Sequence, residues 1–219
     1  AGKSTLLKAI SGIVEADTGA VLLDGRDITH APPNEIAEHG VTQLPGGSGI
    51  FPSLTVAENL RAASWLNRKS ASKDWNAYHK RALENFPILA DRLEDEAGNL
   101  SGGQQQILAL AMAFLSQPRL LMIDELSLGL APVIVEELLP KLQTLAKEGV
   151  TIVLVEQSVN VALTVADTAY FMEKGEIKFH GETSELLKRP DVLRSVFLEG
   201  ASVGLDKAQK EAEEPTDLS

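Results

Sequence analysis

The sequence contains no cysteine, few aromatic residues and a deficit of basic residues. The absence of cysteine excludes a disulfide framework and thiolate metal sites, and it is typical of a reducing cytoplasm. Lysine and arginine number 20 against 31 aspartates and glutamates, and the net charge of -11 argues against a protein that binds the phosphate backbone of nucleic acids. The apolar runs are too short to span a bilayer. With 219 residues and 44% hydrophobic content, the chain is able to bury the core of one domain.

The chain opens on a phosphate-binding pattern. Gly2-Lys3-Ser4-Thr5 matches the end of a phosphate loop, in which backbone N–H groups surround the phosphates, a lysine reaches the β/γ oxygens and a hydroxyl ligates Mg²⁺. Apolar residues follow at helical spacing, with Gly12 where a C-cap glycine belongs, and this favours a phosphate loop over a chance match in a surface turn. The complete motif has a further glycine five positions earlier, so we expect a fragment that begins inside its own phosphate loop.

A second pattern begins at Ser101. Ser101-x-x-Gln104 forms a capping box, in which the serine hydroxyl accepts from the N3 amide while glutamine reaches back to the N-cap amide. Gly102 and Gly103 remove side chains, so we expect backbone N–H groups to approach a ligand here, and the helix dipole favours an anion. An ordinary glycine-rich helix start is the alternative for these residues taken alone.

The third pattern is an apolar strand that ends in two carboxylates. Residues 120–123 are continuously apolar, as expected for a central parallel strand buried on both faces. Ligands of open α/β sheets lie beyond the carboxyl ends of the strands, where we expect Asp124 and Glu125. Successive strand side chains point in opposite directions, so the two carboxylates can take different roles. The apolar strand before the pair and residues 127–132 behind it argue against a solvated loop pair.

In this order, the three patterns resemble the nucleotide-binding subunit of an ATP-binding-cassette (ABC) transporter, from residue 1 to about residue 198. The resemblance implies ATP and Mg²⁺ as cofactors. Asp124 would hold Mg²⁺ together with the Ser4 hydroxyl, and Glu125 would act as general base on the attacking water. The active unit would be a head-to-tail dimer around two ATP molecules, with residues 127–132 crossing the interface. The nucleotide would be bound by Gly2, Lys3, Ser4 and Thr5 of one subunit and by Ser101, Gly102, Gly103 and Gln104 of the other.

The resemblance also implies an α/β fold of the P-loop NTPase type, with a mainly parallel central sheet, a small antiparallel β-subdomain and an inserted helical subdomain. Residues 19–28 predict two short strands joined by an Asp-Gly turn, which fits the β-subdomain. A capping box at Thr55 and Glu58 opens a helix through Leu66, and the helical subdomain would span about 55–99 and dock on the membrane partner. We place the ATPase domain at 1–198 and a disordered acidic tail at 199–219.

Further elements follow from periodicity and turn signals. We expect a short strand at 41–44, an amphipathic helix from Pro132 to Lys147 with proline at N1, a second buried strand at 151–155, and a hairpin of 168–173 with 176–180. Four aromatic residues of the helical segment are expected in the core more than at a contact surface: Trp65, Trp75, Tyr78 and Phe86. Four histidines show no metal-ligand spacing and are interpreted as ordinary polar residues: His30, His39, His79 and His180.

Two positions depart from the family pattern. Most ABC ATPases carry a histidine that bonds the γ-phosphate where this chain has Gln157, which we assign to catalysis alongside Glu125. Glutamine donates a neutral hydrogen bond but carries no positive charge, and it also occurs in the branched-chain-type subfamily. Gly46 follows Leu44-Pro45 where relatives usually carry Gln or Glu, which puts coupling to the membrane partner in question. Gln43 lies three residues before Gly46, and the sequence leaves open whether its side chain compensates for the missing Gln or Glu.

The phrases at 50–60, 127–132 and 154–157 are similar to the second ATP-binding subunit of branched-chain amino-acid importers, a group that also serves urea and short-chain amides. We therefore expect ATP hydrolysis that energises such an importer, peripheral to the cytoplasmic face of the membrane. The partners would be a second ATPase subunit, in a homo- or heterodimer, transmembrane permease subunits and, indirectly, a substrate-binding protein, with no nucleic acid. An importer of urea or short-chain amides and a regulatory pseudo-ATPase stay open. DNA-repair and translation ATPases would need coiled-coil heptads or a second cassette, and the sequence has neither.

Overall fold

A computed structural model describes residues 2–46, 49–64, 75–186 and 188. The chain divides into two compact units, Lys3–Val155 and a second unit that joins Ala1–Gly2 to Glu156–Ser219. Among the described residues, no helix combines the length and the apolar character that a membrane span requires.

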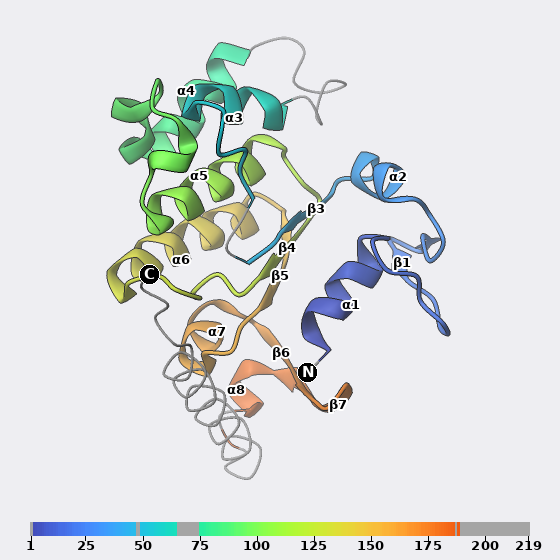
Figure 1. Ribbon diagram of the computed structural model, residues 1–219. Helices are drawn as coiled ribbons and strands as arrows, with labels where there is room; N and C mark the ends of the chain where they lie inside the picture. Colours follow the sequence, from blue (N-terminus) through green and yellow to red (C-terminus); the bar gives the residue numbers. More distant parts are fainter. Residues whose placement is uncertain (1, 47–48, 65–74, 187, 189–219) are drawn as a thin grey trace, which may run out of the picture. The chain divides into compact units, whose positions relative to one another are not determined.

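The first unit is built on a three-stranded parallel sheet (Figure 1). Its strands are β3 (Val41–Leu44), β4 (Leu120–Asp124) and β5 (Thr151–Val155), in the order β3-β4-β5. The central strand β4 pairs with both neighbours, and its residues Leu121, Met122 and Ile123 are fully buried. The prediction of a central strand buried on both faces before the acidic pair is therefore confirmed.

The prediction that β5 is also buried is wrong for the described residues. Val153 is 37% exposed, and Ile152 and Leu154 are only half-buried. Thr151 is also exposed, and alternate residues of a strand share one face of the sheet, so the face of β5 that carries Thr151 and Val153 lacks cover. Apolar β-branched residues predict a strand, but the neighbours decide its burial.

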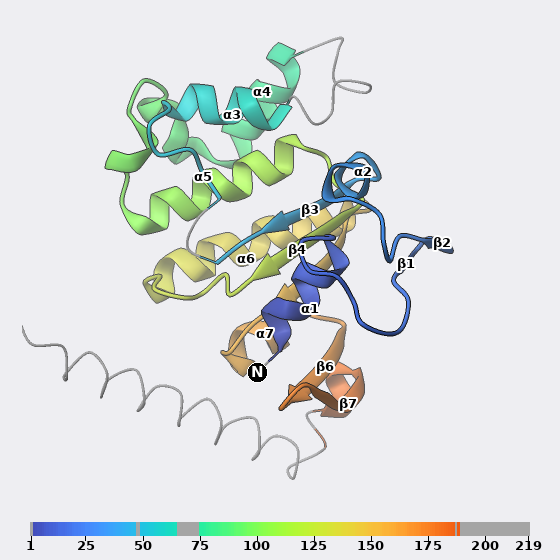
Figure 2. The ribbon, with the colours of Figure 1, turned by 45° about the vertical axis from the view of Figure 1, so that its right-hand side comes forward.

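Helices cover both faces of this sheet (Figures 1 and 2). Helix α1 (Lys3–Ile10) lies on one face, where its Leu7 packs with Val41 and Met122 in a buried cluster. Helix α5 (Gly102–Leu115) contacts β3 from the other side, and α6 (Pro132–Lys147) contacts both α5 and β5. Gly12 has φ +72 and ends the turn after α1, as predicted. The predicted proline at N1 of α6 is confirmed.

The segment between α1 and β3 holds the predicted hairpin. Strands β1 (Leu22–Leu23) and β2 (Arg26–Asp27) pair antiparallel. Asp24 and Gly25 both have positive φ, +49 and +80, which is the backbone of a type I′ turn. The short helix α2 (Pro33–Glu38) follows and buries Ile36 in the same cluster as Leu7.

The segment between β3 and α5 is helical and packs on α5. It contains α3 (Val56–Ser64), α4 (Trp75–Asn85) and two 3₁₀ turns, η2 (Pro87–Arg92) and η3 (Ala97–Asn99). The Thr55 capping box is confirmed, because the Glu58 carboxylate accepts from the Thr55 N–H at 2.8 Å and the Glu58 N–H donates back to the Thr55 hydroxyl at 3.2 Å. Phe86 is buried edge-on against Phe114, as expected, whereas Trp65 and the predicted helix end at Leu66 lie outside the described residues.

The described part of the second unit contains a hairpin and two helices. They are α7 (Val159–Val165), β6 (Thr168–Glu173), β7 (Glu176–Glu182) and α8 (Thr183–Leu186). The predicted hairpin is confirmed, although β7 runs to Glu182, and its turn residues Lys174 and Gly175 have φ +48 and +85. The predicted tail at 199–219 lies outside the described residues, so its disorder and the domain limit at 198 stay predictions.

Candidate active site

The acidic pair lies at the carboxyl edge of the parallel sheet. Leu44 pairs with Ile123 and Asp124 pairs with Val155, so the three strands end at the same edge. The Glu125 N–H donates to the Val155 carbonyl at 2.8 Å and extends this alignment one residue beyond β4. Asp124 is the last residue of β4 and Glu125 is the first residue after it, so the carboxyl ends of the strands carry the acidic pair, although only Glu125 lies beyond the strand.

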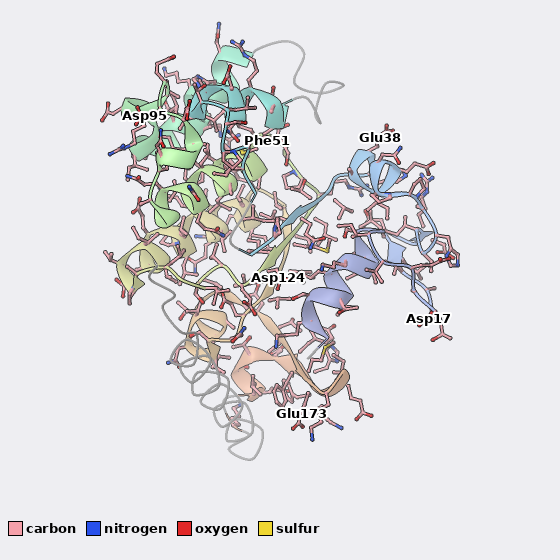
Figure 3. All side chains as sticks on the ribbon, in the orientation of Figure 1. Asp17, Glu38, Phe51, Asp95, Asp124 and Glu173 are labelled. Carbon is pink, nitrogen blue, oxygen red and sulfur yellow. The ribbon has the colours of Figure 1, made fainter. Side chains whose placement is uncertain are left out.

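Asp124 carries a buried carboxylate oxygen that has no hydrogen-bond partner among the described residues. Figure 3 labels this residue at the end of β4. A buried ionised carboxylate is costly unless a donor or a cation compensates it. Carboxylate oxygen is also the ligand type that Mg²⁺ takes in phosphate-handling sites. The residue therefore fits a magnesium ligand.

A magnesium ion here would need further ligands from outside the acidic side chains. The described residues contain no group of three or more His, Asp or Glu side chains that could hold a metal ion. Mg²⁺ commonly uses one or two carboxylates and completes its shell with water and substrate phosphates. Asp124 alone is thus suited to an ion that arrives with a nucleotide.

Glu125 is held in a left-handed backbone conformation, with φ +54. For a residue other than glycine, such a conformation costs about 1–3 kcal/mol and concentrates at functional sites. Strand alternation was expected to separate the two carboxylates, but β4 ends at Asp124. The turn after the strand, and not the pleat, therefore sets the direction of the Glu125 side chain, which corrects that expectation.

Gly46 lies directly against the acidic pair. A Cβ atom at this position would lie 2.9 Å from the Asp124 carbonyl oxygen and 3.7 Å from the Glu125 Cβ. The first distance is shorter than real Cβ contacts, so a side chain here requires a shift of residues 45–46 or of the Asp124 backbone. The sequence marked Gly46 as a departure, whereas only the structure shows that a side chain here would meet the Asp124 backbone.

Gln43 does not take over the position of the missing side chain. Its Oε1 accepts a 2.7 Å hydrogen bond from the hydroxyl of Ser11, just after α1. This side chain is therefore tied to the end of α1, while Gly46 lies at Asp124. Of the two outcomes left open by the sequence, the structure supports the absence of compensation.

The phosphate-loop residues begin α1, which runs antiparallel to β4. Both ribbon views show its first turn nearer the carboxyl end of β4 than its last turn (Figures 1 and 2). Lys3 and Ser4 in this turn are half-buried, and Thr5 is exposed. Gly2 has φ +102, a conformation that favours glycine, and belongs to the second unit.

The start of α5 has the predicted capping box. The Ser101 N–H donates to the Gln104 side chain at 3.0 Å, and the Gln104 N–H donates to the Ser101 hydroxyl at 3.3 Å. A Cβ at Gly102 would meet nothing within 4 Å, so a ligand can approach there. A Cβ at Gly103 would lie 3.4 Å from the Ile134 side chain, so this glycine faces α6 and its missing side chain opens no approach for a ligand.

The segment after the acidic pair leads through two turns to α6. The Leu128 N–H donates to the Glu125 carbonyl at 3.2 Å, and the Leu130 N–H donates to the Ser127 carbonyl at 3.2 Å. Gly129 between them has φ +73. Gln157 follows β5 in the sequence but belongs to the second unit, so its catalytic role stays a prediction.

Comparisons with known proteins agree with this geometry. The ABC transporter family matches residues 1–127. The chain is 40% identical over 200 residues to the high-affinity branched-chain amino acid transport ATP-binding protein BraG of Pseudomonas aeruginosa, covering 91% of this chain and 84% of that protein. It is 39% identical over 188 residues to the probable branched-chain amino acid transport ATP-binding protein LivF of Archaeoglobus fulgidus, covering 85% and 78%.

A solved structure shows the same fold. It is the ADP conformation of an ATP-binding cassette of an ABC transporter, with a TM-score of 0.73 and 27% identity over 90% of this chain and 83% of that one. The expected P-loop ABC fold, with its parallel sheet and antiparallel strand pairs, is confirmed. The family match and the relatives together show that the chain belongs to the ABC transporter family and is an ATP-hydrolysing transporter subunit.

Proposed function

We propose that this chain binds Mg²⁺-ATP, hydrolyses it as one half of a two-subunit ATPase, and energises an importer of branched-chain amino acids. It would act at the cytoplasmic face of the membrane, attached to permease subunits. A substrate-binding protein would deliver the substrate to these permease subunits. The observation that carries the ATPase site is the buried Asp124 oxygen without a partner, beside Glu125 at the carboxyl edge of the sheet.

The roles follow from the chemistry of each group. Asp124 would complete the shell of Mg²⁺, and the Ser4 hydroxyl would be the second protein ligand. Lys3 would neutralise the β/γ-phosphates, and Glu125 would take a proton from the attacking water. Gln157 would orient the γ-phosphate as a neutral donor.

The two-subunit arrangement is supported by the placement of the two helix starts. Helix α1, with the phosphate-loop residues, lies on one face of the sheet, and α5, with the Ser101 capping box, lies on the other (Figures 1 and 2). One copy would therefore bind a nucleotide at the start of α1 and offer Ser101 and the open Gly102 position to a nucleotide on a second subunit.

Hydrolysis is tested by Glu125→Gln in the full-length protein. The variant should still bind ATP, while turnover falls by a factor on the order of 10²–10⁴, the usual contribution of a positioned general base. It should also accumulate an ATP-bound dimer, because Ser101 and the amides at the start of α5 are unchanged. Glu137→Gln, an exposed site on α6, removes the same charge and should leave turnover unchanged.

Phosphate release and size-exclusion chromatography with ATP are the measurements. Full turnover in Glu125→Gln, or a monomer with ATP bound, would contradict the assigned role. An unmodified protein that shows no turnover with its permease present would contradict ATP hydrolysis by this chain and would indicate a regulatory pseudo-ATPase.

The transported substrate is supported by the names of the relatives BraG and LivF, which are 40% and 39% identical to this chain. The amino acid itself would not touch this subunit. Uptake into vesicles that contain the chain and its permease partner should be ATP-dependent for leucine, isoleucine or valine. Uptake of urea or acetamide in their place would favour the alternative importer class.

A further inference from the structure

The end of the β6–β7 hairpin lies against Gly2, the first of the proposed nucleotide residues. A Cβ atom at Gly2 would lie 3.5 Å from the Met172 Sδ and 3.5 Å from the Gly175 Cα, which are ordinary van der Waals distances. Gly2 and the hairpin belong to the same compact unit. The Met172 thioether therefore borders the backbone of a residue that is proposed to bind the nucleotide phosphates.

Met172 is also the most exposed of the three methionines in the chain. Met122 in β4 is fully buried and Met112 in α5 is 9% exposed, whereas Met172 is half-buried. The chain contains no cysteine, so no thiol competes with these thioethers for an oxidant. Because the oxidation of sulfur side chains follows their exposure, an oxidant should react with Met172 first.

Oxidation of Met172 would change the group that faces Gly2. The sulfur lone pair attacks one oxygen of a hydroperoxide, the O–O bond breaks, and the thioether becomes a sulfoxide while water or an alcohol leaves. A thioether is apolar and polarizable, whereas a sulfoxide is polar and its oxygen accepts hydrogen bonds. Such an oxygen beside Gly2 competes with a phosphate for backbone N–H donors and repels the phosphate oxygens.

We propose that Met172 is a peroxide-sensitive modification site, and that its conversion to the sulfoxide weakens nucleotide binding at Gly2. The effect on binding rests on the proposed function, in which Gly2 contacts the nucleotide, whereas the selective oxidation of Met172 does not depend on it. Methionine sulfoxide reductases reverse this modification, so the site would make nucleotide binding reversibly dependent on oxidising conditions.

The test treats the full-length protein with hydrogen peroxide. Peptide mass spectrometry should show the sulfoxide at Met172 before it appears at Met112 or Met122. At a dose that oxidises Met172 alone, calorimetric titration should show Kd values for ATP and ADP that are about fivefold to tenfold higher, which corresponds to the loss of one hydrogen bond. Treatment with methionine sulfoxide reductases A and B should restore both Kd values.

Three variants separate the role of Met172 from general oxidative damage. Met172→Leu removes the sulfur and keeps an apolar side chain of similar volume, so peroxide should no longer change either Kd. Met112→Leu makes the same change at a buried methionine and should keep the full response to peroxide. Met172→Gln places a polar amide beside Gly2 and should raise both Kd values without any oxidant.

The inference is overturned if Met112 is oxidised as fast as Met172, if oxidation of Met172 alone leaves both Kd values unchanged, or if Met172→Leu still responds to peroxide. An unmodified protein that binds neither ATP nor ADP would overturn the proposed function together with this inference. Nucleotide binding that is insensitive to the Met172 sulfoxide would contradict this inference alone.

Discussion

Replacing Gly46 by alanine should displace the acidic pair and slow hydrolysis. The new Cβ would lie 2.9 Å from the Asp124 carbonyl oxygen, and ordinary contact begins at 3.4 Å. About 0.5 Å of movement is therefore needed, either in residues 45–46 or in the backbone of Asp124. That backbone carries both the proposed magnesium ligand and, through the next peptide bond, the proposed base.

The size of the effect follows from two opposing terms. Overpacking of this kind costs about 1–3 kcal/mol. Alanine also restricts the backbone of the unfolded chain, which offsets about 0.4–1 kcal/mol of the overpacking cost. This offset applies here because Gly46 is not in the left-handed region where alanine is strained. The free energy of unfolding should fall by about 0.5–2 kcal/mol and Tm by about 1–8 °C. ATP turnover should fall about tenfold, since a misplacement of 1 Å can cost about 10²-fold.

Gly49→Ala is the matched control on the same segment. Its Cβ would meet the ends of side chains, Leu44 Cδ1 at 3.0 Å and Ala109 Cβ at 3.3 Å, and no backbone atom of the acidic pair. Turnover of this variant should stay within about twofold of the unmodified protein, because the flexible Leu44 side chain can yield. Steady-state phosphate release and thermal unfolding of the full-length protein measure both effects.

Gly46→Gln separates the structural argument from the family resemblance. The resemblance places a glutamine or glutamate here in relatives, which would predict an unchanged or faster reaction. The contact with Asp124 predicts a slower one. Turnover of Gly46→Ala and Gly46→Gln at or above that of the unmodified protein would refute the reasoning, because it would show that this segment moves away from Asp124 without consequence.

Two other perturbations are predicted. Gln157→Ala should slow ATP hydrolysis by less than Glu125→Gln does, because a neutral donor stabilises less transition-state charge than a cation would, and equal loss in both variants would assign more of the catalysis to Gln157. Asn59→Leu should lower the free energy of unfolding by about 1–3 kcal/mol, because it leaves the Phe51 N–H without its 2.7 Å acceptor, while the carbonyls of Phe51 and Thr55 keep their backbone donors. Thermal unfolding measures the second effect, and Asn76→Leu at an exposed site of α4 should change stability by less than about 0.5 kcal/mol.

The local features of this protein were predictable because neighbours in the chain determine them. Two capping boxes, at Thr55 and Ser101, form as their spacing predicts, since the partners are one helical turn apart. The Asp24-Gly25 and Lys174-Gly175 turns adopt the positive φ angles that a two-residue hairpin requires. The order of the motifs was sufficient to indicate the family as well, since the family match covers residues 1–127, which contain all three motifs.

Other features were determined only by the tertiary structure, because they depend on contacts between residues that lie far apart in the sequence. The exposure of β5 reflects what packs on the face that carries Thr151 and Val153, and composition carries no information on that. Gly103 faces Ile134, a residue of another helix, so two adjacent glycines that look alike in sequence have different surroundings. The contact of Gly46 with Asp124 and the bond of Ser11 to Gln43 likewise join distant segments. Periodicity specifies which face of an element is apolar, but only packing specifies what lies against it.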